Sequence, residues 1–151
     1  MSHPNKAPFI GVLTVVDEPS TKAPAGARGH RVLLTKEAAR EALGSLIGMG
    51  INIATDSANH DPKKKIGIID NAELCGKEIV VTGYLFQRDF PGEVLKLAAS
   101  SGYGMSYEIV DARVEDMRAV VWELTRATFT GAAVLLREKA AYTMTDFVVL
   151  S

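Results

Sequence analysis

Ser106 and His60 have the residue types and settings of a nucleophile and its base. Ser106 follows Gly102 and Gly104 at the predicted start of a strand, and glycine lets the backbone turn sharply and another chain approach closely. A serine hydroxyl becomes a good nucleophile when a base takes its proton, and histidine is the usual base near neutral pH. His60 lies in the polar loop 59–62, where Pro62 restricts the preceding residue. The two residues are therefore candidates for acyl-transfer chemistry, while the simpler interpretations are an ordinary turn serine and a solvated loop histidine.

A third group must orient the imidazole and stabilise the imidazolium that forms. Glu123 is a candidate because it lies in an apolar strand, where a carboxylate is costly unless it is paired. Strand alternation allows a simpler interpretation, in which Glu123 shares a solvent face with Thr125, opposite Trp122 and Leu124. Three other carboxylates could equally serve as the third member: Asp56, Asp61 and Glu108.

Other sequence motifs exclude several classes of site. The chain has no P-loop, no dinucleotide fingerprint and no HExxH motif. Its histidines, His3, His30 and His60, are about 30 residues apart, so we expect no metal site. The residues around Ser106 do not form GxSxG, because position 108 is glutamate. Cys75 is interpreted as a small turn residue. We expect no cofactor.

Short apolar runs predict the elements that position these residues. Strands are expected at 9–16, 31–34, 51–54, 66–69, 78–86, 105–110, 120–129 and 146–150. Helices are expected from the Thr35 N-cap to Gly48, over 91–100, and within 131–141, while 17–30 is a loop and 71–77 a turn. Strict β-α alternation is missing, which favours an α+β fold with a mostly antiparallel sheet or barrel.

Composition is that of an ordinary globular domain. The chain has 151 residues, 47% of them apolar and 23% charged, which predicts one domain spanning 1–151 and excludes disorder, collagen and coiled coil. The net charge of −1 provides no field to recruit nucleic acid or an anionic membrane. The N-terminal residues lack the hydrophobic run of a signal peptide, and a single cysteine suits a reducing compartment.

Several segments resemble the tailed-phage prohead proteases, a family related in fold to the herpesvirus capsid maturation protease, assemblin. The stretch 59–62, followed by Ile66 and Gly67, resembles the histidine motif. The stretch 80–86 resembles the next strand, 105–109 the nucleophile strand, and 122–125 the strand whose glutamate is taken as the third triad member. The similarity extends over roughly residues 9–136.

The resemblance implies a serine protease on an antiparallel-rich β-barrel of about six to seven strands with peripheral helices. Ser106 would attack, His60 would transfer the proton and Glu123 would hold the imidazole. In assemblin, a loop about eight residues beyond the third triad residue provides the oxyanion donors. The equivalent count reaches Gly131 here, so the backbone N–H groups of Gly131 and Ala132 are the expected oxyanion hole, at the start of the predicted helix.

The resemblance also implies a biological role. The enzyme would cleave scaffold protein, and possibly itself, during phage head maturation. Its partners would be scaffold and other capsid proteins as peptide substrates, without nucleic acid or membrane. Its location would be the host cytoplasm, inside the assembling procapsid. Two alternatives are a hydrolase with another substrate on the same fold and a non-enzymatic β-rich structural or interaction module of a phage particle.

Overall fold

A computed structural model describes residues 3–54 and 63–150 of the chain. The strands are β1 (Ala7–Val15), β2 (Arg31–Leu34), β3 (Gly50–Ala54), β4 (Lys65–Cys75), β5 (Glu78–Leu85), β6 (Tyr103–Val114), β7 (Val121–Leu136) and β8 (Asp146–Val149). The helices are α1 (Lys36–Ala42) and α2 (Pro91–Ala98), with 3-10 turns at Leu43–Leu46 and Arg137–Lys139. None of the described helices is long and apolar enough to cross a membrane.

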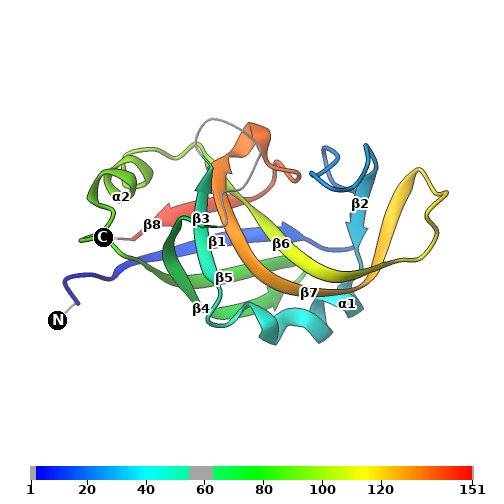
Figure 1. Ribbon diagram of the computed structural model, residues 1–151, viewed down its shortest axis with the longest axis horizontal. Coiled ribbons are helices and arrows are strands. Elements are labelled where there is room, and N and C mark those ends of the chain that lie inside the picture. Colours follow the sequence, from blue (N-terminus) through cyan, green and yellow to red (C-terminus); the bar gives the residue numbers. More distant parts are fainter. Residues whose placement is uncertain (1–2, 55–62, 151) are drawn as a thin grey trace.

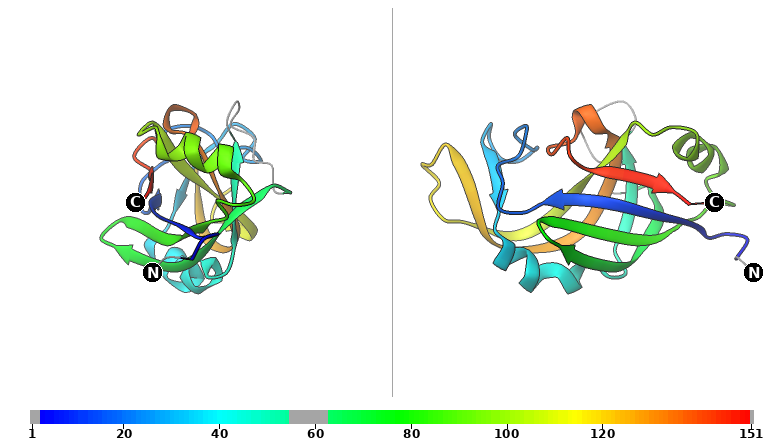
Figure 2. Two further views of the ribbon diagram at one scale, coloured as in Figure 1. Left: turned by 90° about the vertical axis from the view of Figure 1, so that its left-hand side faces the viewer. Right: turned by 180° about the vertical axis from the view of Figure 1, so that it is seen from behind.

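The described strands form one mixed sheet that curls into a nearly closed barrel. The strand order is β2-β7-β3-β4-β5-β1-β8, with β6 paired to β7. β7 is the hub: its first residues pair in parallel with β2, its last with β3, and β6 follows it antiparallel. The β6–β7 hairpin bends through a long arc across the front of the molecule (Figure 1). Seen end-on, the strands wrap around a common interior (Figure 2).

Apolar residues at alternate strand positions fill this interior. β5 alternates buried and exposed residues along its length, as expected for an antiparallel strand with one face on the core. The rings of Phe9 and Phe147 lie 4.9 Å apart between β1 and β8. Gly11 on β1 leaves room for the Met105 side chain of β6. This close approach lets β6 pack against β1.

Helix α1 covers the lower edge of the barrel (Figure 1). Thr35 caps it, because its Oγ1 accepts a hydrogen bond of 3.1 Å from the Ala38 N–H. Three small residues form its buried face: Ala38, Ala39 and Ala42. Their size allows the helix to lie close to β7. The predicted N-cap and the strand 31–34 before it are confirmed.

The predicted α+β architecture is confirmed, and the strands predicted at 78–86, 105–110 and 120–129 belong to one sheet. Two local predictions are wrong. β4 continues to Cys75, so the turn is confined to Gly76 and Lys77. The predicted helix at 131–141 is also wrong, because β7 continues to Leu136 and only a 3-10 turn follows. Pairing with β6 and β3 on both sides overrides the helix preference of this alanine- and leucine-rich segment.

Candidate active site

Ser106 lies on β6 in a row of residues that crosses four strands. Ser106 is opposite Ala133 on β7, Ala133 is opposite Asn52 on β3, and Asn52 is opposite Lys65 on β4. Residues opposite one another in a sheet project from the same face. Two strand spacings separate Ser106 from Asn52, which is about 10 Å. The small side chain of Ala133 leaves the space between them open.

Glu108 extends across this row from the same face of β6. Its Oε2 accepts a hydrogen bond of 2.6 Å from Asn52 Nδ2, and its Oε1 lies 3.9 Å from Lys65 Nζ. The side chain is 17% exposed. It passes over Gly131 on β7, where a Cβ would lie 2.5 Å from Glu108 Oε1. The fold therefore holds a largely buried carboxylate over β7, on the same face of the sheet as Ser106.

Asn52 is a polar residue that sequence reasoning missed. It is fully buried in β3, between Ile51 and Ile53. Its Oδ1 has no hydrogen-bond partner among the described residues. The available signal was an amide in an otherwise apolar strand, since a buried polar group is costly unless it is bonded. The same argument drew attention to Glu123.

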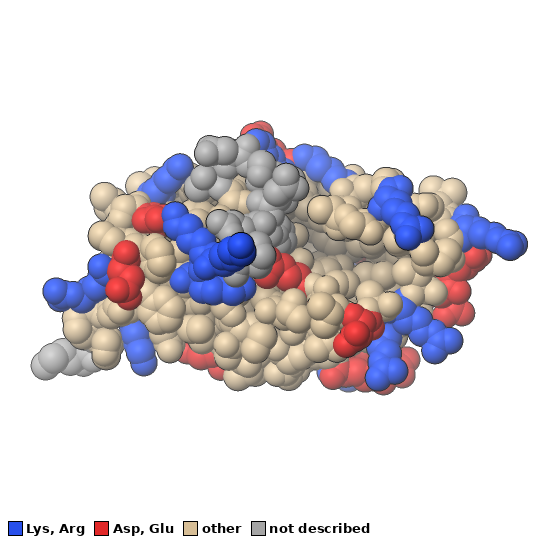
Figure 3. Space-filling view, in the orientation of Figure 1, with Lys and Arg blue, Asp and Glu red and all other residues tan. Residues whose placement is uncertain are grey.

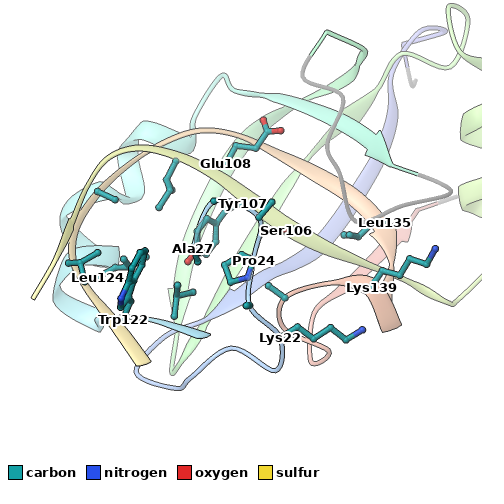
Figure 4. Close-up of a pocket in the computed structure, with 18 residues that line it drawn as sticks. Lys22, Pro24, Ala27, Ser106, Tyr107, Glu108, Trp122, Leu124, Leu135 and Lys139 are labelled. Atoms are coloured by element: carbon teal, nitrogen blue, oxygen red, sulfur yellow. The ribbon is translucent and has the colours of Figure 1, made fainter. Parts of the chain in front are cut away.

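A groove with a volume of about 620 Å³ passes Ser106 and Glu108 and follows β6, and Leu135 and Lys139 line it on the other side of Ser106 (Figure 4). Residues 22–27 form the facing wall, and Trp122 and Leu124 line the far end (Figure 4). The hollow is visible from the front, with mostly uncharged walls (Figure 3). Lining residues run from Ser106 to Val114 on β6, about 25 Å of strand. The groove can therefore hold an extended peptide segment of several residues.

Glu123 is not brought together with Ser106. It is exposed, whereas its neighbours Trp122 and Leu124 are 7% and 4% exposed and line the groove. Strand alternation therefore directs Glu123 away from the groove. It also lies ten residues before Ala133, the partner of Ser106, which is about 30 Å along the strand. The solvent-face interpretation of Glu123 is the one that the structure supports.

His60 lies outside the described residues, as do Asp56 and Asp61. The described residues on either side of this segment are Ala54, the last residue of β3, and Lys63, shortly before β4. Ala54 is opposite Leu135, which is opposite Gly104. The segment that carries His60 therefore joins the two strands that contribute Asn52 and Lys65.

Gly131 and Ala132 lie within β7, not at a helix start. Gly131 is opposite Glu108, and Ala132 is opposite Tyr107 on one side and Ile51 on the other. The helix N-terminus that would have aimed their N–H groups at an oxyanion does not form at these residues. The oxyanion role of Gly131 and Ala132 stays a prediction, and the structure places Gly131 beneath the Glu108 side chain.

The hydroxyl groups of two tyrosines near Ser106, Tyr107 and Tyr142, are buried. Burial raises the pKa of the Tyr107 hydroxyl, and burial is also the main cause that raises the pKa of Tyr142. The Tyr142 hydroxyl lies 2.8 Å from the Glu18 carbonyl oxygen, to which it donates. The Tyr107 hydroxyl has no hydrogen-bond partner in the described part of the chain. Both groups stay protonated near neutral pH and add no charge to the site.

The curled mixed sheet, with the nucleophile candidate on one arm of its long hairpin, has the fold of the herpesvirus-type proteases. Among solved structures, KSHV protease, in complex with a hexapeptide phosphonate inhibitor, matches with a TM-score of 0.59 and 13% identity; the match covers 96% of this chain and 65% of that one. The bacteriophage T4 capsid assembly protease, gp21, matches with a TM-score of 0.55 and 14% identity, over 87% of this chain and 98% of that one.

These two comparisons confirm the predicted fold. The chain spans 65% of the length of the KSHV protease chain. No protein-family model matches the chain, and no curated protein sequence matches it.

Proposed function

We propose that this chain is a serine endopeptidase of phage head assembly, with Ser106 as the nucleophile and His60 as the general base. The observation that carries the proposal is the position of Ser106, in a peptide-sized groove and on the same face of β6 as the largely buried carboxylate of Glu108. Two proteases of viral origin share the fold. The same fold could support other chemistry, so the proposal depends on the site itself.

The mechanism follows from these groups. Ser106 Oγ attacks the scissile carbonyl while His60 takes its proton, and His60 then returns the proton to the leaving amine. A carboxylate must stabilise the imidazolium in between. Glu108 takes this role in the proposal in place of Glu123, because Glu108 is two residues from Ser106 and held toward β3.

The proposed substrates are scaffold and other capsid proteins, cleaved inside the assembling procapsid, and self-cleavage belongs to the same proposal. The T4 neighbour is a capsid assembly protease, and the KSHV protease binds a hexapeptide phosphonate. A long apolar groove suits an extended segment of polypeptide better than a small polar molecule. The net charge of −1 gives little long-range attraction, so confinement with substrate would favour cleavage.

The test is cleavage of the scaffold and capsid proteins of the same particle by the purified chain. We expect discrete fragments with the wild type and none with Ser106→Ala. Ser101→Ala is the matched control, because Ser101 is an exposed serine five residues earlier, and it should cleave at the wild-type rate. Cleavage by Ser106→Ala at the wild-type rate would refute the assignment. A folded wild type that cleaves nothing would favour the non-enzymatic module.

A further inference from the structure

We propose that Asn52 is a positioning residue that holds the carboxylate of Glu108 on the face of the sheet that carries Ser106. The inference rests on the proposed function, since it assigns a part in the same reaction. Asn52 acts through Glu108 and does not touch the reacting atoms. Its role is to fix the direction of a carboxylate that would otherwise have many rotamers on a long side chain.

The contact between the two side chains is short and shielded. Asn52 Nδ2 donates to Glu108 Oε2 at 2.6 Å, which is the length of a charge-assisted hydrogen bond. Asn52 is fully buried, so water does not compete at its end of the bond. Lys65 Nζ approaches the other oxygen, Oε1, at 3.9 Å. The carboxylate is therefore held by an amide from β3 and a cation from β4.

An asparagine at position 52 lowers the stability of the fold, and packing alone does not explain why this residue is present. Its Oδ1 is buried without a partner among the described residues, and such groups reduce stability. An apolar residue at this position would leave no buried polar atom without a partner. It would, however, remove the hydrogen bond that Asn52 donates to Glu108 Oε2. An aspartate would place two carboxylates in contact.

Gly131 is a second, independent observation that the fold accommodates this carboxylate. β7 separates Glu108 on β6 from Asn52 on β3. The Glu108 side chain reaches Asn52 by crossing over Gly131, where a Cβ would come 2.5 Å from Oε1. Gly131 is not one of the described glycines that have a positive φ. The missing side chain, and not backbone freedom, is what the crossing requires.

The test is a double-mutant cycle on peptide cleavage. We expect Asn52→Ala to lower kcat by about 10–100-fold, as for residues that orient catalytic ligands elsewhere, with KM within about twofold. In the Glu108→Ala background, Asn52→Ala should have no further effect, because its action passes through Glu108. Asn71→Ala is the control, since Asn71 is an exposed asparagine on β4.

Gly131→Ala tests the same carboxylate without altering Asn52. It should lower kcat by a similar factor at unchanged KM. Gly44→Ala is the control and should leave kcat unchanged, because an added Cβ at Gly44 meets nothing within 4 Å. If the effects of Asn52→Ala and Glu108→Ala multiply, Asn52 has only a structural role and the inference is wrong. Full activity of Asn52→Ala, with Ser106→Ala inert, would overturn this inference and leave the protease assignment standing. A wild type without protease activity would overturn both.

Discussion

Replacing Glu108 by glutamine distinguishes the proposed third member of the triad, Glu108, from Glu123, the one that the family resemblance implies. Glu108→Gln keeps the shape of the side chain and one oxygen that can accept from Asn52 Nδ2. It removes the negative charge that would stabilise the imidazolium of His60. The fold should be retained, so any change in rate reports on this charge.

The size of the effect follows from Coulomb's law. Two unit charges about 4 Å apart interact by about 4 kcal/mol at an effective dielectric constant near 20. The Glu108 side chain is 17% exposed, so this value, and not the value in bulk water, applies. At about 1.4 kcal/mol per tenfold change in rate, loss of the charge should lower kcat about a thousandfold. Lys65, at 3.9 Å, reduces the effect somewhat.

The assay is steady-state cleavage of one peptide by Glu108→Gln and Glu123→Gln under identical conditions. Glu123 is exposed and directed away from the groove, so Glu123→Gln should keep kcat within about twofold and change stability by less than about 0.5 kcal/mol. The reasoning is refuted if Glu123→Gln is inactive while Glu108→Gln cleaves normally. That result would restore the triad predicted from the sequence.

Three further predictions concern the buried tyrosines and the groove. Tyr107→Phe removes a buried hydroxyl that has no hydrogen-bond partner among the described residues, so the free energy of unfolding should rise by about 1 kcal/mol or more in urea titrations; a loss of stability would show that the hydroxyl is bonded. Because burial raises the pKa of Tyr107 and Tyr142, folding favours their protonated forms. The free energy of unfolding should not depend on these groups below about pH 10. Above about pH 10 it should fall by up to about 1.4 kcal/mol per pH unit for each tyrosine; a free energy of unfolding that stays constant between pH 9 and 11.5 would contradict this. Ala112 is exposed and lines the groove, so Ala112→Trp should lower kcat/KM about tenfold for long peptides and leave peptides too short to reach it unaffected; equal effects on both would mean that substrate does not occupy the groove.

Local signals in the sequence were sufficient for elements whose residues agree with their surroundings. The Thr35 cap and the alternating strand at 78–86 needed no knowledge of distant contacts. The segment 131–136 differs, because its composition suits a helix and only pairing with β3 and β6 makes it a strand. Such pairing depends on strands far away in the sequence.

The candidate site shows the same difference between local signals and contacts that are distant in the sequence. Ser106 could be chosen from its local context, but the local argument for Glu123 applied equally to any carboxylate in an apolar strand. Which side of β7 faces the groove depends on residues 22–27 and on the arc of the hairpin. The contact between Asn52 and Glu108 joins residues 56 apart in the chain, and no periodicity encodes it. Alternation gave the correct side for Glu123 once Trp122 and Leu124 were known to be buried.

The central claim is that Ser106 is an activated nucleophile, and covalent labelling tests it most directly. The full chain would be incubated with a hexapeptide phosphonate, which forms a stable bond with an activated serine, and the adduct would be mapped by mass spectrometry. The proposal predicts one adduct per chain, on Ser106, and none on Ser106→Ala with the same thermal unfolding temperature. No adduct on the folded wild type, or an adduct on a different residue, would contradict it.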